Sequence, residues 1–138
     1  MAEPPWIIEW LDAFSMSNPE IDAEHRRFIK LVNELNTEIM SNRQDKAVVR
    51  ELMGLILEDT ITNFSHEERI FAEHNYPASD EHAQSHAEII SRLKQASKEI
   101  QSTSSGRVWI EAGQAIKNLL VDHVLNEDTE FNKYLQTR

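Results

Sequence analysis

The chain has 138 residues, of which 14 are basic and 24 acidic, and a formal net charge of −10. This length suits one domain with a sizeable core, and the acidic balance argues against sequence-independent binding to nucleic acid or to an anionic membrane surface. The sequence contains no cysteine, which excludes disulfides, iron–sulfur clusters, thiolate zinc sites and thiol catalysis.

The N-terminal residues are expected to form an arm, residues 1–18, that packs on a helical bundle. They lack the positive charge of a secretory signal, and no apolar run approaches the ~20 residues of a membrane span. We therefore expect a soluble cytoplasmic protein, either complete or one module of a larger chain.

Four long helices and a short one are predicted to follow the arm. The first covers residues 19–40, with Asn18 as its N-cap and Pro19 at its first position. The second covers residues 46–74, because Pro77 keeps the preceding residue out of helical conformation.

The remaining predicted helices are a third over residues 79–101, a fourth over 107–126 and a short amphipathic helix over 129–135. We expect Ser79 to cap the third helix, with acidic residues in its first turn. Apolar residues in all four long helices recur at alternating spacings of three and four. In the second helix the predicted stripe runs through Leu52, Ile56, Thr60, Asn63, Glu67 and Ile70. This pattern is typical of an all-α, antiparallel up-down-up-down four-helix bundle, in which residues 19–138 form a single domain.

Six polar residues interrupt these apolar stripes: His25, Asn63, Glu67, His82, His86 and His123. In an up-down-up-down bundle they all fall at one end of the core, and the other end is expected to be apolar. A lone buried imidazole bonded to a neighbour is common, but desolvating six such groups is costly unless something satisfies them together.

A metal ion is the simplest partner for this set, because neutral imidazole and carboxylate are metal ligands. His82 and His86 are spaced i, i+4 and can reach one ion. Asp128 lies five residues after His123, which is ~140° away on a regular helix. It joins the site only if the fourth helix loosens or contains a π-type turn, and by spacing alone a solvated Asp is favoured.

The segments EIDAEH, NFSHEE, YPASDEHAQSH and DHVLNED resemble the hemerythrin family, especially its bacterial single-domain members. The resemblance implies a non-haem centre of two iron ions with carboxylate and oxo bridges. His82, His86 and His123 would hold one iron and His25 the other. Glu67 and Asp128 would bridge the two. The implied function is binding of dioxygen, or another small diatomic ligand, for carriage, delivery or sensing, and not enzymatic turnover.

The sequence departs from the family pattern at Asn63, where a second His on the dioxygen-binding iron is expected. Three outcomes follow, in order of preference. A water or the Asn63 carbonyl fills the position, or His66 reaches in from ~100° around the helix, or the second position stays empty and the protein holds one iron.

Four apolar residues are expected to wall the ligand pocket beside this iron: Phe64, Leu119, Leu120 and Val124. The family often has Trp where Leu119 stands. A second exchangeable position predicts a less durable dioxygen complex than is usual for the family. The alternatives are a mononuclear or metal-depleted interaction or sensor module, and a di-iron centre that reacts with peroxide or nitric oxide. Manganese or zinc in place of iron, and the oligomeric state, stay open.

Overall fold

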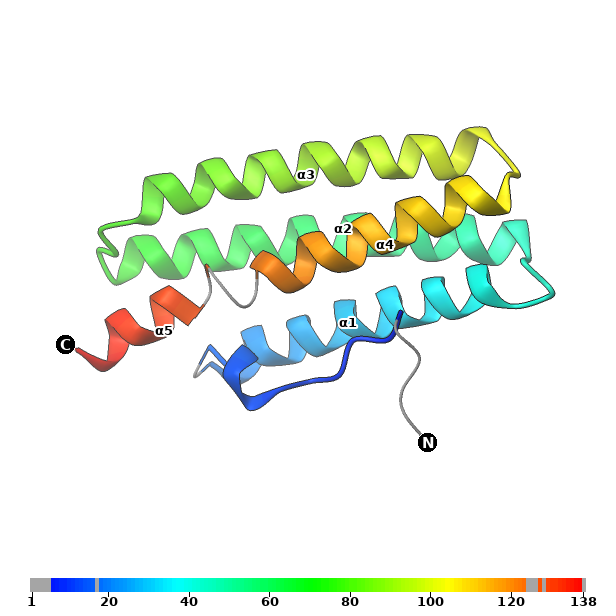
Figure 1. Cartoon of the computed structure of the whole chain (residues 1–138). Coiled ribbons are helices and arrows are strands. Elements are labelled where there is room, and N and C mark those ends of the chain that lie inside the picture. Colours follow the sequence, from blue (N-terminus) through cyan, green and yellow to red (C-terminus); the bar gives the residue numbers. More distant parts are fainter. Residues whose placement is uncertain (1–5, 17, 124–126, 128, 138) are drawn as a thin grey trace.

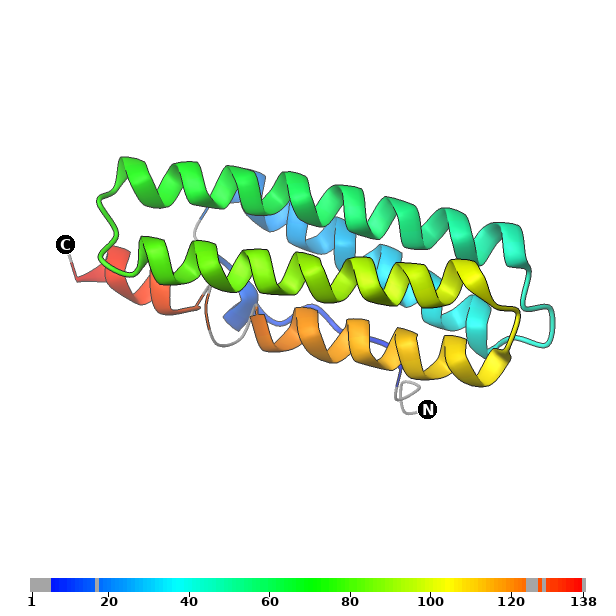
Figure 2. The same ribbon diagram turned by 90° about the horizontal axis from the view of Figure 1, so that it is seen from above.

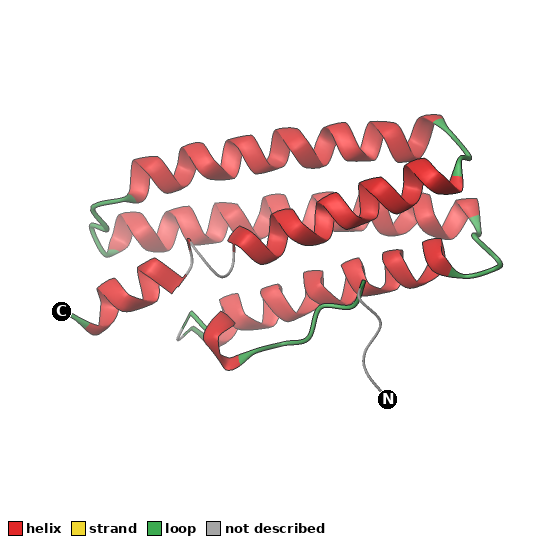
Figure 3. Ribbon diagram, viewed as in Figure 1, coloured by secondary structure: helices red, strands yellow, loops and turns green. Residues whose placement is uncertain are grey.

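The computed structural model describes residues 6–16, 18–123, 127 and 129–137, and these form helices without any strand (Figure 3). The elements in chain order are a short 3-10 helix, Asp12–Phe14, and then α1 (Pro19–Met40), α2 (Lys46–Glu73), α3 (Ser79–Ser102), α4 (Gly106–Asp122) and α5 (Thr129–Gln136).

The four long helices form an antiparallel bundle in which α1 packs against α2 and α4, and α3 packs against the same two helices (Figures 1 and 2). The arm runs back along α1, and α5 lies at the end where α2 passes into α3. The predicted fold class is therefore confirmed. The domain boundary at residue 18 stays a prediction. No helix in the described part of the chain is long and apolar enough to cross a membrane.

Most helix ends follow from local side-chain chemistry. Asn18 caps α1 as predicted, since its Oδ1 accepts from the backbone N–H groups of Glu20 and Ile21 at 3.0 and 3.1 Å. The prediction that Ser79 caps α3 is wrong, because Ser79 is already helical and no side chain caps this helix. At the end of α2 the chain turns at Asn75, whose φ is +52°.

The apolar core continues along α2 through residues spaced four, three and four apart, namely Val49, Met53, Ile56 and Thr60. Leu52 and Ile70, which the predicted stripe contained, are only partly buried at its edge. Phe71 takes the buried position beside Ile70 and packs with Phe131 of α5 at a ring-centroid distance of 4.5 Å.

The end of the core away from the six polar residues also buries two polar side chains that lie off the predicted stripes. Asn36 and Glu38 are buried there. Asn36 donates to the carbonyl of Gly113 at 3.3 Å. The Glu38 carboxylate accepts from Arg43 and from the backbone N–H of Asp45, and so fastens the turn between α1 and α2.

Candidate metal centre

The bundle brings the start of α1, the end of α2, the start of α3 and the end of α4 to one end of the core. Every polar residue of the predicted stripes is buried there, each with at most 5 % of its surface exposed: His25, Asn63, Glu67, His82, His86 and His123.

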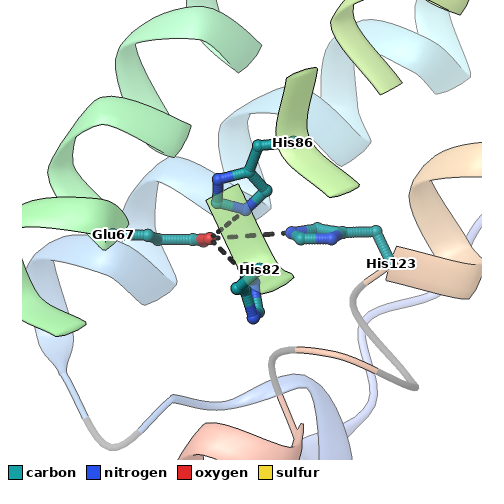
Figure 4. Close-up of side chains that lie close together, drawn as sticks. All are labelled: Glu67, His82, His86 and His123. Atoms are coloured by element: carbon teal, nitrogen blue, oxygen red, sulfur yellow. Dashed lines mark ion pairs between the residues drawn. The ribbon is translucent and has the colours of Figure 1, made fainter. Parts of the chain in front are cut away.

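Glu67 is the centre of this cluster (Figure 4). Its Oε1 lies 3.2 Å from Nε2 of His86, 3.6 Å from Nε2 of His123 and 4.0 Å from Nε2 of His82. One ligand atom from each of these four residues lies within 4.8 Å of those from the other three. Two helices besides α2 therefore direct imidazoles at one carboxylate oxygen.

The other oxygen of the same carboxylate faces His25 on α1. Oε2 of Glu67 and Nε2 of His25 are 2.7 Å apart, and both side chains are fully buried. Burial raises the pKa of the Glu67 carboxyl, but the imidazoles of His123, His25 and His86 lower it further, so the pKa lies well below its ordinary value. Glu67 is thus an ionised carboxylate with different imidazoles on its two oxygens.

Two further carboxylates orient the imidazoles from outside the cluster. Glu127 Oε2 lies 3.0 Å from Nδ1 of His123, and Glu68 Oε2 lies 3.3 Å from Nδ1 of His86. Because a carboxylate can only accept, Nδ1 of each ring is the donor. When the ring is neutral, Nε2 carries the lone pair with which it can bind a cation beside Glu67.

Glu127 was not predicted as a site residue. Burial raises the pKa of its carboxyl, but His123 and a hydrogen bond from Ser85 lower it to a net value of about 2. The i, i+4 spacing from His123 was the signal that could have found it. Glu68 was judged a poorer ligand than Glu67, and the structure gives it an orienting contact with His86 instead.

Two predicted site residues, Asp128 and Val124, follow the end of α4 in the sequence. His123 and Glu127 are both in π-helical conformation, the kind of turn that the spacing of His123 and Asp128 requires. Asp128 and Val124 themselves lie outside the described residues.

Asn63 is buried but does not turn its amide donor towards Glu67. Its Nδ2 donates to Oε1 of Glu24 on α1 at 2.9 Å, and its Oδ1 makes no hydrogen bond with the described residues. His66 contacts the same Glu24, since its Nδ1 lies 2.5 Å from Oε2. The amide nitrogen of Asn63 and the imidazole of His66 are thus both engaged with α1.

Of the predicted pocket residues, Phe64 packs against two of the imidazoles, those of His86 and His123. The ring of Phe64 stacks on His86 at a centroid distance of 3.7 Å and an interplanar angle of 3°. Leu120 is fully buried, whereas Leu119 is partly buried and lines a surface pocket between α3 and α4 that also includes His123. Phe64 therefore covers His86, and Leu119 lies beside a surface pocket that reaches His123.

The residues present fit a metal ion. Nε2 of His86 and Oε1 of Glu67 are buried, and neither makes a hydrogen bond within the described part of the chain. Leaving such atoms unsatisfied in a core is costly, and imidazole nitrogen and carboxylate oxygen together suit iron, zinc and manganese. A bound cation satisfies both atoms at once.

Comparison with known proteins gives the same assignment over nearly the whole chain. Residues 17–135 match the family model described as the hemerythrin HHE cation binding domain. The chain is 23 % identical over 125 residues to a bacteriohemerythrin of Stenotrophomonas maltophilia, covering 91 % of this chain and 79 % of that protein. It is 25 % identical over 129 residues to a myohemerythrin of Riftia pachyptila, covering 94 % of each. A hemerythrin-like protein of Naegleria gruberi is 24 % identical over 131 residues, with 95 % and 96 % covered.

Proposed function

Because the chain belongs to the hemerythrin HHE cation-binding domain family, we propose that it is a non-haem iron protein that binds dioxygen or another small diatomic ligand. Membership of the family implies iron binding. The diatomic ligand, and its carriage, delivery or sensing, are our proposal. The observation that carries it is the Glu67 carboxylate, fully buried and facing imidazoles on both oxygens.

The proposed ligand set follows the two sides of this carboxylate. His82, His86 and His123 would hold one iron together with Glu67, and His25 would hold a second iron together with the same carboxylate. Asp128 is proposed as a further ligand from the family resemblance, and the π-helical conformation of His123 supports it.

The second iron has one imidazole fewer than the family pattern implies. The unbonded Oδ1 of Asn63 supports the proposal that this carbonyl, or a water beside it, fills the position. The contact between His66 and Glu24 argues against compensation by His66, because that imidazole is already engaged outside the core.

When bound, iron supplies an open coordination position and a reversible change of oxidation state. The chain's own residues prepare the site for this ion. Glu68 and Glu127 fix the tautomers of His86 and His123, so that Nε2 is free of a proton. Phe64 and Leu120, both buried, are proposed to exclude water from the side where a small ligand would lie.

The experiment is to load the protein with Fe²⁺ without air, record its absorption spectrum, admit dioxygen, and then remove the gas under vacuum. A dioxygen carrier or sensor gives a spectral change that reverses when the gas is removed. No change in a protein that contains iron would overturn the proposal that it binds dioxygen.

A second candidate function is reaction with peroxide, which the replacement of an imidazole by Asn63 favours. Loss of one firm ligand gives the second iron a further exchangeable position for a reactant. In the same experiment, an irreversible change with dioxygen, together with turnover of peroxide and a reductant, would favour this function over reversible binding.

A further inference from the structure

A separate group of potential ligands lies where the start of α1 faces the end of α2. It consists of Glu20 and Glu24, one turn apart on α1, and His66 on α2. One ligand atom of each residue lies within 4.8 Å of the other two. Glu20 is exposed, and Glu24 and His66 are partly exposed, so this group is accessible to solvent, unlike the inner cluster.

The contacts within the group converge on Glu24. Its Oε2 lies 2.5 Å from Nδ1 of His66. Its Oε1 accepts from Nδ2 of Asn63 at 2.9 Å. One oxygen of Glu24 thus contacts the imidazole of His66, and the other accepts from the amide of Asn63. A carboxylate, an imidazole and an amide therefore meet at Glu24.

Asn63 is an independent indication that a ligand belongs here. It is 1 % exposed, its amide is directed at Glu24, and its Oδ1 has no hydrogen-bond partner in the described chain. A half-turn of the amide exchanges oxygen and nitrogen, and the two orientations differ little in shape. In the turned orientation Oδ1 faces the group of carboxylates and finds a partner if a cation lies there.

Ordinary surface electrostatics accounts for part of this arrangement only. A carboxylate in the first turn of α1 is favourable near the positive end of the helix. Two carboxylates spaced i, i+4, however, repel each other on the face they share. A divalent cation between Glu20 and Glu24 converts this repulsion into two attractive contacts.

We propose that Glu20, Glu24 and His66 form an outer divalent-cation site, with the carbonyl of Asn63 as a neutral fourth ligand. A carbonyl turned towards this outer site does not face the second iron, whose open position is then filled by the water. One imidazole with carboxylate and amide oxygens is a ligand set for Zn²⁺, Mn²⁺ or Fe²⁺. Glu20, Glu24 and His66 all lie outside the inner cluster around Glu67. The outer site therefore does not depend on iron bound at Glu67.

Zn²⁺ is the probe of choice, because it undergoes no redox change. Metal-free protein is dialysed against buffered free Zn²⁺, and zinc per chain is counted by elemental analysis. We expect Glu24→Gln and His66→Gln each to bind one Zn²⁺ fewer than the wild type. Circular dichroism checks that each variant is folded. The matched control is Glu51→Gln, which removes an exposed carboxylate near the start of α2 and should bind as the wild type does.

A Glu67→Gln variant separates this proposal from the proposed function. The inner cluster is impaired in this variant, whereas the Zn²⁺ ion that depends on Glu24 should remain. If the inner cluster holds no metal at all, the wild type should still bind one Zn²⁺ more than Glu24→Gln. Equal zinc counts in the wild type, Glu24→Gln and His66→Gln would overturn the outer site.

Discussion

Asn63 should decide how firmly the proposed second iron is held. It stands where the family resemblance implies an imidazole, and the structure shows its amide bonded outward to Glu24. An amide oxygen is a neutral and weaker donor than imidazole, so the iron beside His25 should be the more easily lost of the two. The same weakness should shorten the life of a bound diatomic ligand.

Replacing Asn63 with His restores the missing imidazole. We expect the Asn63→His variant to retain its second iron against a competing chelator better than the wild type, and its dioxygen complex to persist longer in air. Asn118→His, which adds an imidazole at an exposed position of α4, is the control. Unchanged iron content and spectrum in Asn63→His would mean that this position does not contact the second iron.

Glu127 contacts the imidazole of His123, and we expect it to act on a bound metal through that ring. Its carboxylate holds Nδ1 of His123 at 3.0 Å and is itself held by Ser85. Loss of such an orienting group typically weakens metal binding by about 10- to 100-fold.

The Glu127→Gln variant should therefore bind iron more weakly by about this factor, because its amide can present a donor to the ring and favour the wrong tautomer. Competition with a chelator of known affinity measures the effect. Glu111→Gln, on an exposed face of α4, should behave as the wild type. An affinity equal to that of the wild type in Glu127→Gln would show that this contact does not set the tautomer of His123.

Side-chain spacing predicted the buried ligand candidates but not the carboxylates behind them. His82, His86 and Glu67 stand out because polar groups break an apolar stripe. Glu68 and Glu127 lie off those stripes, where a carboxylate that orients an imidazole has the same sequence signature as a solvated one. Only the packed helices show which imidazole each of them contacts.

At the scale of elements, α1 and α4 pack so closely that one helix position has no room for a side chain. A Cβ built on Gly113 would lie 2.0 Å from Oδ1 of Asn36, an impossible contact. The side chain of Asn36 is itself buried and donates to the Gly113 carbonyl, so it cannot simply turn away.

Gly113→Ala should therefore destabilise the bundle, by about 1–3 kcal/mol in a urea titration, as overpacked cores do. Gly54 provides a matched control in α2, since a Cβ there meets nothing within 4 Å. Gly54→Ala should stabilise the fold by about 0.5–1 kcal/mol through helix propensity. A neutral or stabilising Gly113→Ala would show that α1 and α4 can separate without cost.

The turn between α1 and α2 should make stability depend on pH through Glu38. Hydrogen bonds from the Arg43 side chain and from the Asp45 backbone lower the pKa of the Glu38 carboxyl from 4.5 to about 2. Because the pKa is lower in the folded state, the carboxylate stabilises the fold fully above pH 4.5, and this contribution is lost as the pH falls towards about 2.

Glu38→Gln should accordingly be less stable than the wild type at neutral pH, and the difference should shrink as the pH falls through this window. Urea titrations of both proteins at several pH values measure it, and the comparison cancels the titration of other groups. Glu51→Gln is the exposed control. A difference that is the same at every pH would show that the ionised Glu38 carboxylate does not stabilise this turn.

The starts of all five helices, and the ends of all but the fourth, were predicted to within a residue. The fourth helix was predicted to reach residue 126, whereas α4 ends at Asp122, and residues 124–126 lie outside the described residues. Asn18 caps α1 as its position before Pro19 indicates. Ser79 does not cap α3, because the tight turn after Pro77 brings it into the helix. Met53, and not Leu52, is buried in the core, because the spacing of buried residues from Val49 continues through Met53. The predicted stripe began at Leu52 and therefore missed Met53.

At the scale of the whole molecule, alternating threes and fours over four helices determine an antiparallel bundle and, with it, the meeting of four helix ends. The prediction of a polar cluster at that end followed from topology and is confirmed by the burial around Glu67. The resemblance to the hemerythrin family is also confirmed, by a match over residues 17–135. The burial of Asn36 and Glu38 at the opposite end was not predicted. Each makes a local hydrogen bond, and the spacing of apolar residues does not indicate such bonds.

The central claim is that the cluster around Glu67 holds iron, and its most direct test is iron content per folded chain. Wild type and Glu67→Gln are loaded with Fe²⁺ without air, desalted, and measured by elemental analysis and absorption spectroscopy in the same samples. We predict two irons per wild-type chain, the second lost first to a chelator, and a lower count in folded Glu67→Gln. A folded wild-type chain that retains no iron, or a Glu67→Gln chain that retains as much as the wild type, would contradict the claim.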